Sequence, residues 1–196
     1  FVSKDALNID GFGKKIVQNF WEIGLIKLPH DIFDLDFNRI SKLDGWGSLS
    51  VDNLKKSIQK SKKISLDKFI FSLGIRHIGQ ENAKLLSEFL KKKENFFRLK
   101  NQNYIRELIN IDGIGDTQIN SLKNFFNEKI NLEVISNLSK SLIIQNFKEK
   151  NVKGKLNGQV FMITGKLNNI SRAEAKSMIE NNGGKIISNV TKKLDY

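Results

Sequence analysis

The stretch KLDGWG contains residue types that carry out covalent chemistry in other proteins. Lys42, Asp44 and Gly45 match K-x-D-G, the pattern around the lysine that accepts AMP in nucleotidyl-transferring enzymes. Two further stretches align with it without gaps, NIDGFG at 8–13 and NIDGIG at 110–115. Both have asparagine in the place of the lysine, so what repeats is Asp, Gly, an apolar residue and a second Gly. The repeat therefore predicts a turn here, with Lys42 exposed at the end of a helix.

A fourth, degenerate copy of the repeat reads RHIG and ends at Gly79. The second glycines, Gly13, Gly47, Gly79 and Gly115, are separated by 34, 32 and 36 residues. Apolar residues spaced three and four apart follow each of them, which predicts a helix after every turn. Such a period also fits a solenoid, but the recurring element here is the turn. We expect units of helix, tight G-x-G turn and helix.

Glycine-rich turns of this kind can bind phosphate. Glycine adopts positive φ at little cost, and the turn leaves bare N–H groups at the positive end of the next helix. Several such ends could hold the backbone of a duplex without reading its bases; in the alternative interpretation, each glycine pair only joins two helices. The candidate DNA-binding residues are Gly11, Gly13, Lys14, Lys15, Gly45, Gly47, Ser48, Arg76, His77, Gly79, Gly113, Gly115 and Thr117.

The third turn departs from the pattern because His77 occupies the position of the first glycine. We expect this turn to have a different shape, with Arg76 and His77 facing DNA; a structural histidine is the alternative. The residues between the glycines are expected to pack inward rather than to stack on bases: Phe12, Trp46 and Ile114.

The chain has 196 residues, of which 33 are basic and 21 acidic, for a formal net charge of +12. Positive charge is in excess both before and after residue 150, which favours a polyanionic partner, nucleic acid first. A lysine-rich composition without such a partner is the alternative. The arginines are therefore the more informative cations: Arg39, Arg76, Arg98, Arg106 and Arg172.

Several classes of protein are disfavoured by composition. There are no cysteines and only two histidines, which lie far apart in sequence, so we expect neither disulfides nor a metal site in this chain. No apolar run approaches the roughly 20 residues of a membrane span, and no signal-peptide pattern opens the chain. A soluble, cytoplasmic protein is expected.

The sequence predicts two domains: a helical domain at 1–138, a linker at 139–153 and an α/β domain at 154–196. In the second domain, a helix over 170–184 with Ser171 and Glu174 as a capping box separates two apolar runs. Strand, helix and strand predict a parallel unit. Because two parallel strands do not make a stable sheet, and the chain lacks an initial Met, we expect part of a longer protein with a partly ordered second domain.

The stretches FVSKDALNIDGFGKKI, LDKFIFSLGIRHIGQENAKLL and NIDGIG resemble the helix-hairpin-helix motifs in the carboxy-terminal half of bacterial NAD-dependent DNA ligases. The tail, LNGQVFMITGKLNNISRAEAKSMIENNGGKIISNVTKKLDY, resembles the first half of the BRCT domain that ends those ligases. The resemblance implies a mainly α fold of four helix-hairpin-helix motifs in one domain, followed by a truncated α/β BRCT domain with a parallel sheet. It also implies a monomer that binds nicked double-stranded DNA through the minor groove and has no membrane contact.

In that family, the nucleotidyltransferase domain with the AMP-accepting lysine precedes the segment that this chain resembles. The intact enzyme uses NAD as the AMP donor, magnesium for catalysis and zinc in a four-cysteine module. We therefore expect this segment to be inactive alone, without catalytic residues and without a bound cofactor. Phosphate-binding BRCT domains also imply Thr164, Gly165 and Arg172 as a phosphate site, for a protein or a DNA end; a core Thr-Gly turn is the alternative.

Two other functions fit parts of the pattern. A DNA glycosylase or excision nuclease would place a catalytic acid such as Glu133 after its hairpin, although such enzymes generally carry a single hairpin. A non-ligase repair scaffold would hold DNA with the hairpins and a phosphorylated protein with the BRCT part.

Overall fold

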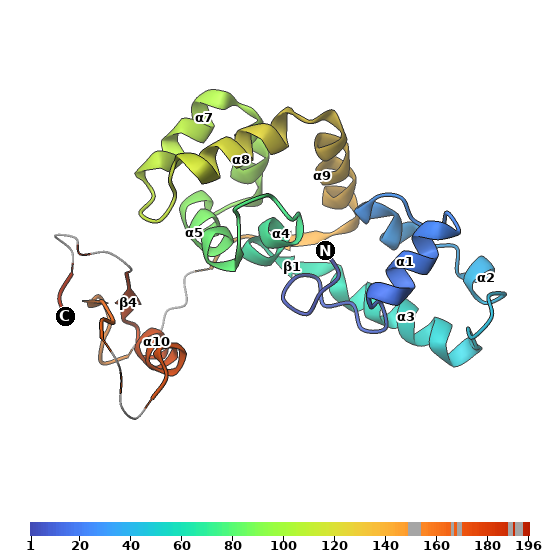
Figure 1. Cartoon of the computed structure of the whole chain (residues 1–196), viewed down its shortest axis with the longest axis horizontal. Helices are drawn as coiled ribbons and strands as arrows, with labels where there is room; N and C mark the ends of the chain where they lie inside the picture. The colour runs from blue at the N-terminus through green and yellow to red at the C-terminus, as the bar shows by residue number, and fades with distance from the viewer. Residues whose placement is uncertain (149–153, 166, 168–169, 188–189, 191–193) are drawn as a thin grey trace. The chain divides into compact units, whose positions relative to one another are not determined.

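The computed structural model describes residues 1–148, 154–165, 167, 170–187, 190 and 194–196, which divide into two compact units, Phe1–Phe147 and Lys148–Tyr196. The first unit is helical, as predicted (Figure 1). Its elements are α1 (Lys14–Glu22), η1 (Pro29–Asp34), α2 (Phe37–Ile40), α3 (Ser48–Ser61), β1 (Lys63–Ser65), α4 (Leu66–Ser72), α5 (Gln80–Leu90), α6 (Lys93–Phe97), η2 (Arg98–Lys100), α7 (Gln102–Arg106), η3 (Glu107–Asn110), α8 (Asp116–Asn127), α9 (Lys129–Ser141) and β2 (Ile143–Gln145).

Phenylalanine rings fill much of the core of the helical unit. Phe96 is fully buried, and its ring centroid lies 5.9 Å from that of Phe69, 5.9 Å from that of Phe97 and 5.4 Å from that of Phe126. All three pairs are edge-to-face, the arrangement that aromatic quadrupoles favour. These rings come from α4, α6 and α8, so the cluster joins the helices around the last two turns.

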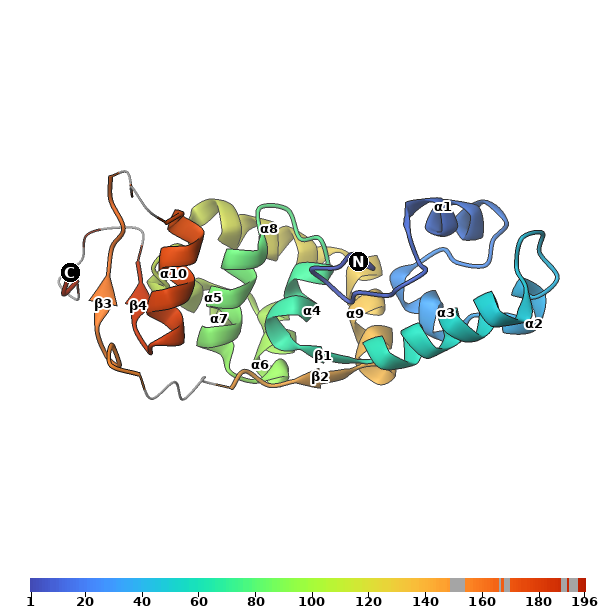
Figure 2. The same cartoon turned by 90° about the horizontal axis from the view of Figure 1, so that it is seen from below.

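A short parallel sheet that the sequence did not predict completes the helical unit. β1 pairs with β2, with Lys63 opposite Ile143 and Ser65 opposite Gln145. The middle residues, Ile64 and Ile144, are both buried. Figure 2 shows the two strands side by side below α4, with α3 leading directly into β1.

The sheet moves the end of the helical unit beyond the predicted boundary at residue 138. α9 continues to Ser141, and β2 and Phe147 belong to the same unit, so residues 139–147 are not the linker that the sequence predicted. The backbone N–H of Phe147 donates to the carbonyl of Lys91 at 2.8 Å, and the Lys91 ammonium lies 4.8 Å from the Phe147 ring centroid. A strand of three residues whose partner lies some 80 positions away leaves no local sequence pattern. For this reason the sequence predicted a linker in this segment.

The second unit contains β3 (Val160–Phe161), α10 (Arg172–Asn181) and β4 (Lys185–Ile186). β3 pairs with β4 in parallel, as predicted, but the strands are shorter than the apolar runs at 159–165 and 185–191. Residues 188–189 and 191 of the second run lie outside the described part of the chain. On the other side of β3, the N–H of Tyr196 and that of Asp195 donate to the carbonyl of Val160.

The predicted capping box begins α10. Ser171 N–H donates to the Glu174 carboxylate at 2.7 Å, and the Ser171 hydroxyl accepts from the Glu174 N–H at 3.1 Å. The backbone hydrogen bond from Ser171, followed by the side-chain one, holds the pKa of the Glu174 carboxyl below its usual value. The cap therefore includes an ionised carboxylate at the positive end of the helix.

Candidate nucleic-acid interface

The four aligned turns have the same backbone conformation. The last residue of each turn has an extended conformation and forms the N-cap of the following helix: α1, α3, α5 or α8. The first residue has positive φ in every case: Gly11 (+78°), Gly45 (+78°), His77 (+61°) and Gly113 (+90°). The repeat in the sequence is thus a repeat of one local geometry.

The prediction of a different shape for the third turn is wrong. His77 adopts the left-handed conformation of the glycines it replaces, although this conformation costs a non-glycine residue roughly 1–2 kcal/mol. Asn82 holds the turn, because its side-chain amide donates to the His77 carbonyl at 2.9 Å. The side chains of Arg76 and His77 are both exposed.

Arg76 also reverses the charge of its turn. In the alignment it takes the place of an aspartate that is present and exposed in the other three copies. The backbone geometry is kept while a negative side chain is exchanged for a positive one. The aspartates concerned are Asp10, Asp44 and Asp112.

The apolar residue in the middle of each turn packs inward, as predicted. Phe12 and Ile114 are buried, and the Trp46 ring is half-buried with its centroid 5.4 Å from that of Phe20. Ile78, the equivalent residue of the third turn, is buried too. These side chains anchor the turns in the core, so the glycines beside them form the outer surface.

The turns before α1, α3 and α5 present backbone donors without acceptors. Glycine N-caps have no side chain to accept from the first N–H groups of the next helix, which are unpaired in any helix. Within the described part of the chain, the N–H groups of Lys14, Ser48 and Gln80 have no hydrogen-bond acceptor. A Cβ added at any glycine of these turns would meet open space: Gly11, Gly13, Gly45, Gly47 and Gly79.

The fourth turn is partly closed. The Gln118 side-chain oxygen accepts from the Gly115 N–H at 3.1 Å, and a Cβ on Gly113 would lie 3.0 Å from Leu85. Among the described residues, the N–H of Asp116 has no acceptor, as at the start of α1, α3 and α5, but the Asp116 carboxylate adds a negative charge there. Thr117 remains exposed. The four aligned turns therefore differ in how well they can accept a phosphate.

The charge of the first helical turn also differs between copies. Lys14 and Lys15 are exposed at the start of α1, whereas Ser48 begins α3 without charge. Glu81 lies in the first turn of α5, the helix that follows Arg76 and His77 in the chain. The first turn thus has the most positive helix start, and the third has its positive charge in the turn itself.

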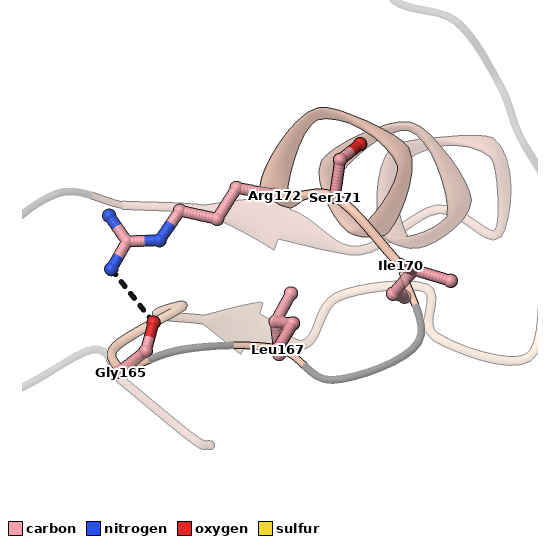
Figure 3. Close-up of a pocket in the computed structure, with 5 residues that line it drawn as sticks. All are labelled: Gly165, Leu167, Ile170, Ser171 and Arg172. Atoms are coloured by element: carbon pink, nitrogen blue, oxygen red, sulfur yellow. Dashed lines mark hydrogen bonds between the residues drawn. The ribbon is translucent and has the colours of Figure 1, made fainter.

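Two of the three residues predicted as a phosphate site in the second unit, Gly165 and Arg172, line a cavity of about 500 Å³, together with Leu167, Ile170 and Ser171. Figure 3 shows the Arg172 side chain extending from the start of α10 toward Gly165, and its Nη2 donates to the Gly165 carbonyl at 2.9 Å. Thr164 is exposed and directly precedes this loop. Gly165 and Arg172 are therefore brought together at the start of α10.

Lys42 of the K-x-D-G pattern lies just after α2 and is exposed, as the repeat predicted. Among the described residues, no group of three or more His, Asp or Glu side chains is arranged to hold a metal ion. No helix of the described segments is long and apolar enough to cross a membrane.

Comparison with known proteins shows which protein families resemble this chain. Residues 68–135, which include the third and fourth turns, match the family model of the helix-hairpin-helix motif, and residues 151–196 match that of the BRCA1 C Terminus (BRCT) domain. The whole chain is 63% identical to a DNA ligase of Pelagibacter ubique and spans 29% of its length. It is 42% identical to a DNA ligase of Rickettsia bellii and 40% identical to one of Rickettsia rickettsii, spanning 30% of each.

Turns of this geometry followed by a parallel α/β unit define a class of proteins that join helix-hairpin-helix motifs to a BRCT domain, and both family models agree with that class. Within it, the chain belongs to the bacterial DNA ligase family, of which it represents the helix-hairpin-helix and BRCT portion. The family predicted from the sequence is confirmed.

Proposed function

We propose that this chain is the DNA-binding portion of an NAD-dependent DNA ligase and holds nicked duplex DNA through its backbone phosphates. The observation that supports this best is the set of three exposed turns with unpaired N–H donors at the start of α1, α3 and α5. Helix N-termini and their N–H groups bind phosphate oxygens, and contacts of this kind position DNA without reading its sequence. The net charge of +12 adds a sequence-independent attraction.

We further propose that the domain organisation and the role of the family apply to this chain. All four turns are helix-hairpin-helix motifs of one domain that extends to Phe147, and a BRCT portion begins near residue 154. The intact enzyme, located in the cytoplasm near the nucleoid, seals nicks in replication and repair, with NAD as AMP donor, magnesium and zinc. This segment binds none of these cofactors, has no catalytic residue and acts as a monomer.

The test is the salt dependence of binding. A fluorescein-labelled duplex with one nick is titrated with the full 196-residue chain at several salt concentrations, and anisotropy gives the affinity. The logarithm of the affinity is expected to fall linearly with the logarithm of salt concentration, with a slope of about −0.9 per phosphate contacted. Scrambling the duplex sequence is expected to leave the curve unchanged. Absent or salt-independent binding would contradict the proposal.

Arg76 provides a second test. Changing Arg76→Asp restores the aspartate of the other three turns, and we expect it to weaken binding by about tenfold, because it replaces an attraction to phosphate by a repulsion of roughly 1–2 kcal/mol in total. The control is His77→Gly, which restores the glycine and should leave the melting temperature equal or higher, since it removes the left-handed strain. Equal affinity of Arg76→Asp and wild type would show that the third turn does not face DNA.

For the second unit we propose a weaker phosphate site made by Thr164, Gly165 and Arg172. Its support is the cavity at the start of α10, where the Arg172 guanidinium is held beside the Gly165 carbonyl. A guanidinium at a helix N-terminus favours an anionic group such as a phosphorylated side chain or a DNA end.

A further inference from the structure

A groove of about 860 Å³ lies between the first and second turns of the helical unit. The turns contribute Asp10, Gly11, Asp44 and Gly45, and the floor is apolar, made by Ile16, Trp46 and Leu54. One face of α3 forms the remaining wall. The residues of that wall are Ser50, Asn53, Lys56, Ser57 and Lys60.

The wall residues form a continuous polar stripe because of their spacing. Ser50, Asn53, Ser57 and Lys60 are three and four positions apart, which places them on one side of a helix. Lys56 and Lys60 are one turn apart, so their backbones are separated by about 6 Å along the axis. The phosphates of one DNA strand advance about 3.4 Å each along the duplex. Two lysines at this separation can therefore contact nearby phosphates of the same strand.

Neither lysine is neutralised by a neighbour. Lys56 and Lys60 are exposed, and within the described segments neither lies within 4.0 Å of a carboxylate, although Asp10 and Asp44 line the same groove. The positive and negative side chains of the groove are thus kept apart, with the carboxylates at the turns and the amines on the helix.

This lining selects for one kind of ligand. A small free anion would be repelled by the two carboxylates, and a purely apolar ligand would leave the polar wall without partners. A sugar-phosphate strand satisfies both parts, since its phosphates can lie along the lysines while its uncharged deoxyriboses lie against Trp46 and Leu54. The two turns that bound the groove carry unpaired N–H donors that suit the same strand.

We propose that this groove holds one strand of the duplex, with Lys56 and Lys60 as phosphate contacts that position the DNA between the first two turns. The inference rests on the proposed function and adds α3 to the binding surface. Sequence reasoning missed these lysines because they lie 9 and 13 residues after the second turn; their spacing of four on the helix that follows Gly47 was the available signal.

The experiment compares two double variants of the full chain that each remove two positive charges. K56Q/K60Q changes the groove, and K63Q/K68Q is the matched control, because Lys63 and Lys68 are exposed in β1 and in the first turn of α4 and belong neither to the groove lining nor to any of the four turns. Binding to the nicked duplex is measured by anisotropy against salt concentration. Loss of two phosphate contacts should make the slope less negative by about 1.8. At 0.1 M salt the affinity of K56Q/K60Q should fall about tenfold, and that of the control less than twofold.

The variant K56R/K60R should retain the wild-type slope, which separates loss of charge from loss of structure. Equal losses in K56Q/K60Q and the control would overturn the inference, because the effect would then be one of net charge alone. An unchanged K56Q/K60Q beside normal wild-type binding would overturn the inference and leave the proposed function standing. Absence of salt-dependent binding in the wild type would contradict both this inference and the proposed function.

Discussion

Proline at the first helical position of the three open turns is expected to weaken binding to nicked duplex DNA about 5- to 150-fold. The triple variant K14P/S48P/Q80P removes one N–H donor from the start of each of α1, α3 and α5. Each helix N-terminus contributes roughly 0.3–1 kcal/mol to binding an anion. Three together contribute about 1–3 kcal/mol, and each 1.4 kcal/mol is a factor of ten in affinity.

The helices should tolerate these prolines. Proline favours the first position of a helix, where the N–H has no partner within the helix. It also needs an extended residue before it. That condition is met, since Gly13, Gly47 and Gly79 have ψ of 173°, 166° and −175°.

The matched control is K14A/S48A/Q80A, which loses the same side chains and keeps the N–H groups. Anisotropy titrations should show a clear difference between the two triple variants, and circular dichroism should show equal helix content. If alanine and proline variants bind equally, the backbone donors make no contact with phosphate.

Phe96→Ala is expected to destabilise the helical unit by about 3–5 kcal/mol, the range for removing a fully buried phenylalanine side chain. Phe96 touches Phe69, Phe97 and Phe126, so the cavity would open between α4, α6 and α8. For a unit of this size, the melting temperature should fall roughly 2–4 °C per kcal/mol. Thermal denaturation followed by circular dichroism measures this fall in melting temperature.

The control for this prediction is Phe89→Ala on α5, where 40% of the side chain is exposed. Phe89→Ala should lower the stability by less than half as much as Phe96→Ala, because less apolar surface returns to water on unfolding. A loss below 1 kcal/mol for Phe96→Ala would mean that the aromatic cluster closes around the cavity and does not hold these helices together.

The turn at KLDGWG belongs to a repeat, and the repeat determines more than the single copy does. One copy matched an active-site pattern, but alignment with NIDGFG and NIDGIG showed that only Asp, Gly, an apolar residue and Gly recur. The repeat predicts no catalytic role for Lys42, and it gave the correct inward packing of Phe12 and Ile114. The periodic apolar residues after each turn likewise gave the helices, because helix formation depends on contacts three and four residues apart.

The sequence by itself thus determined the family, the mainly helical fold, the parallel α/β unit and the positions of the turns, all of which depend on local patterns. Tertiary structure decided what depends on distant residues. The β1–β2 pair joins segments about 80 positions apart, Leu85 and Gln118 close the fourth turn, and α3 meets two separate turns to form the groove beside Lys56 and Lys60. His77 belongs to the same group, because its side chain predicts a different turn while the packed Ile78 and the Asn82 hydrogen bond stabilise the shared one. At such a position the left-handed conformation costs a non-glycine residue roughly 1–2 kcal/mol, and the contacts made by the whole fold outweigh this cost.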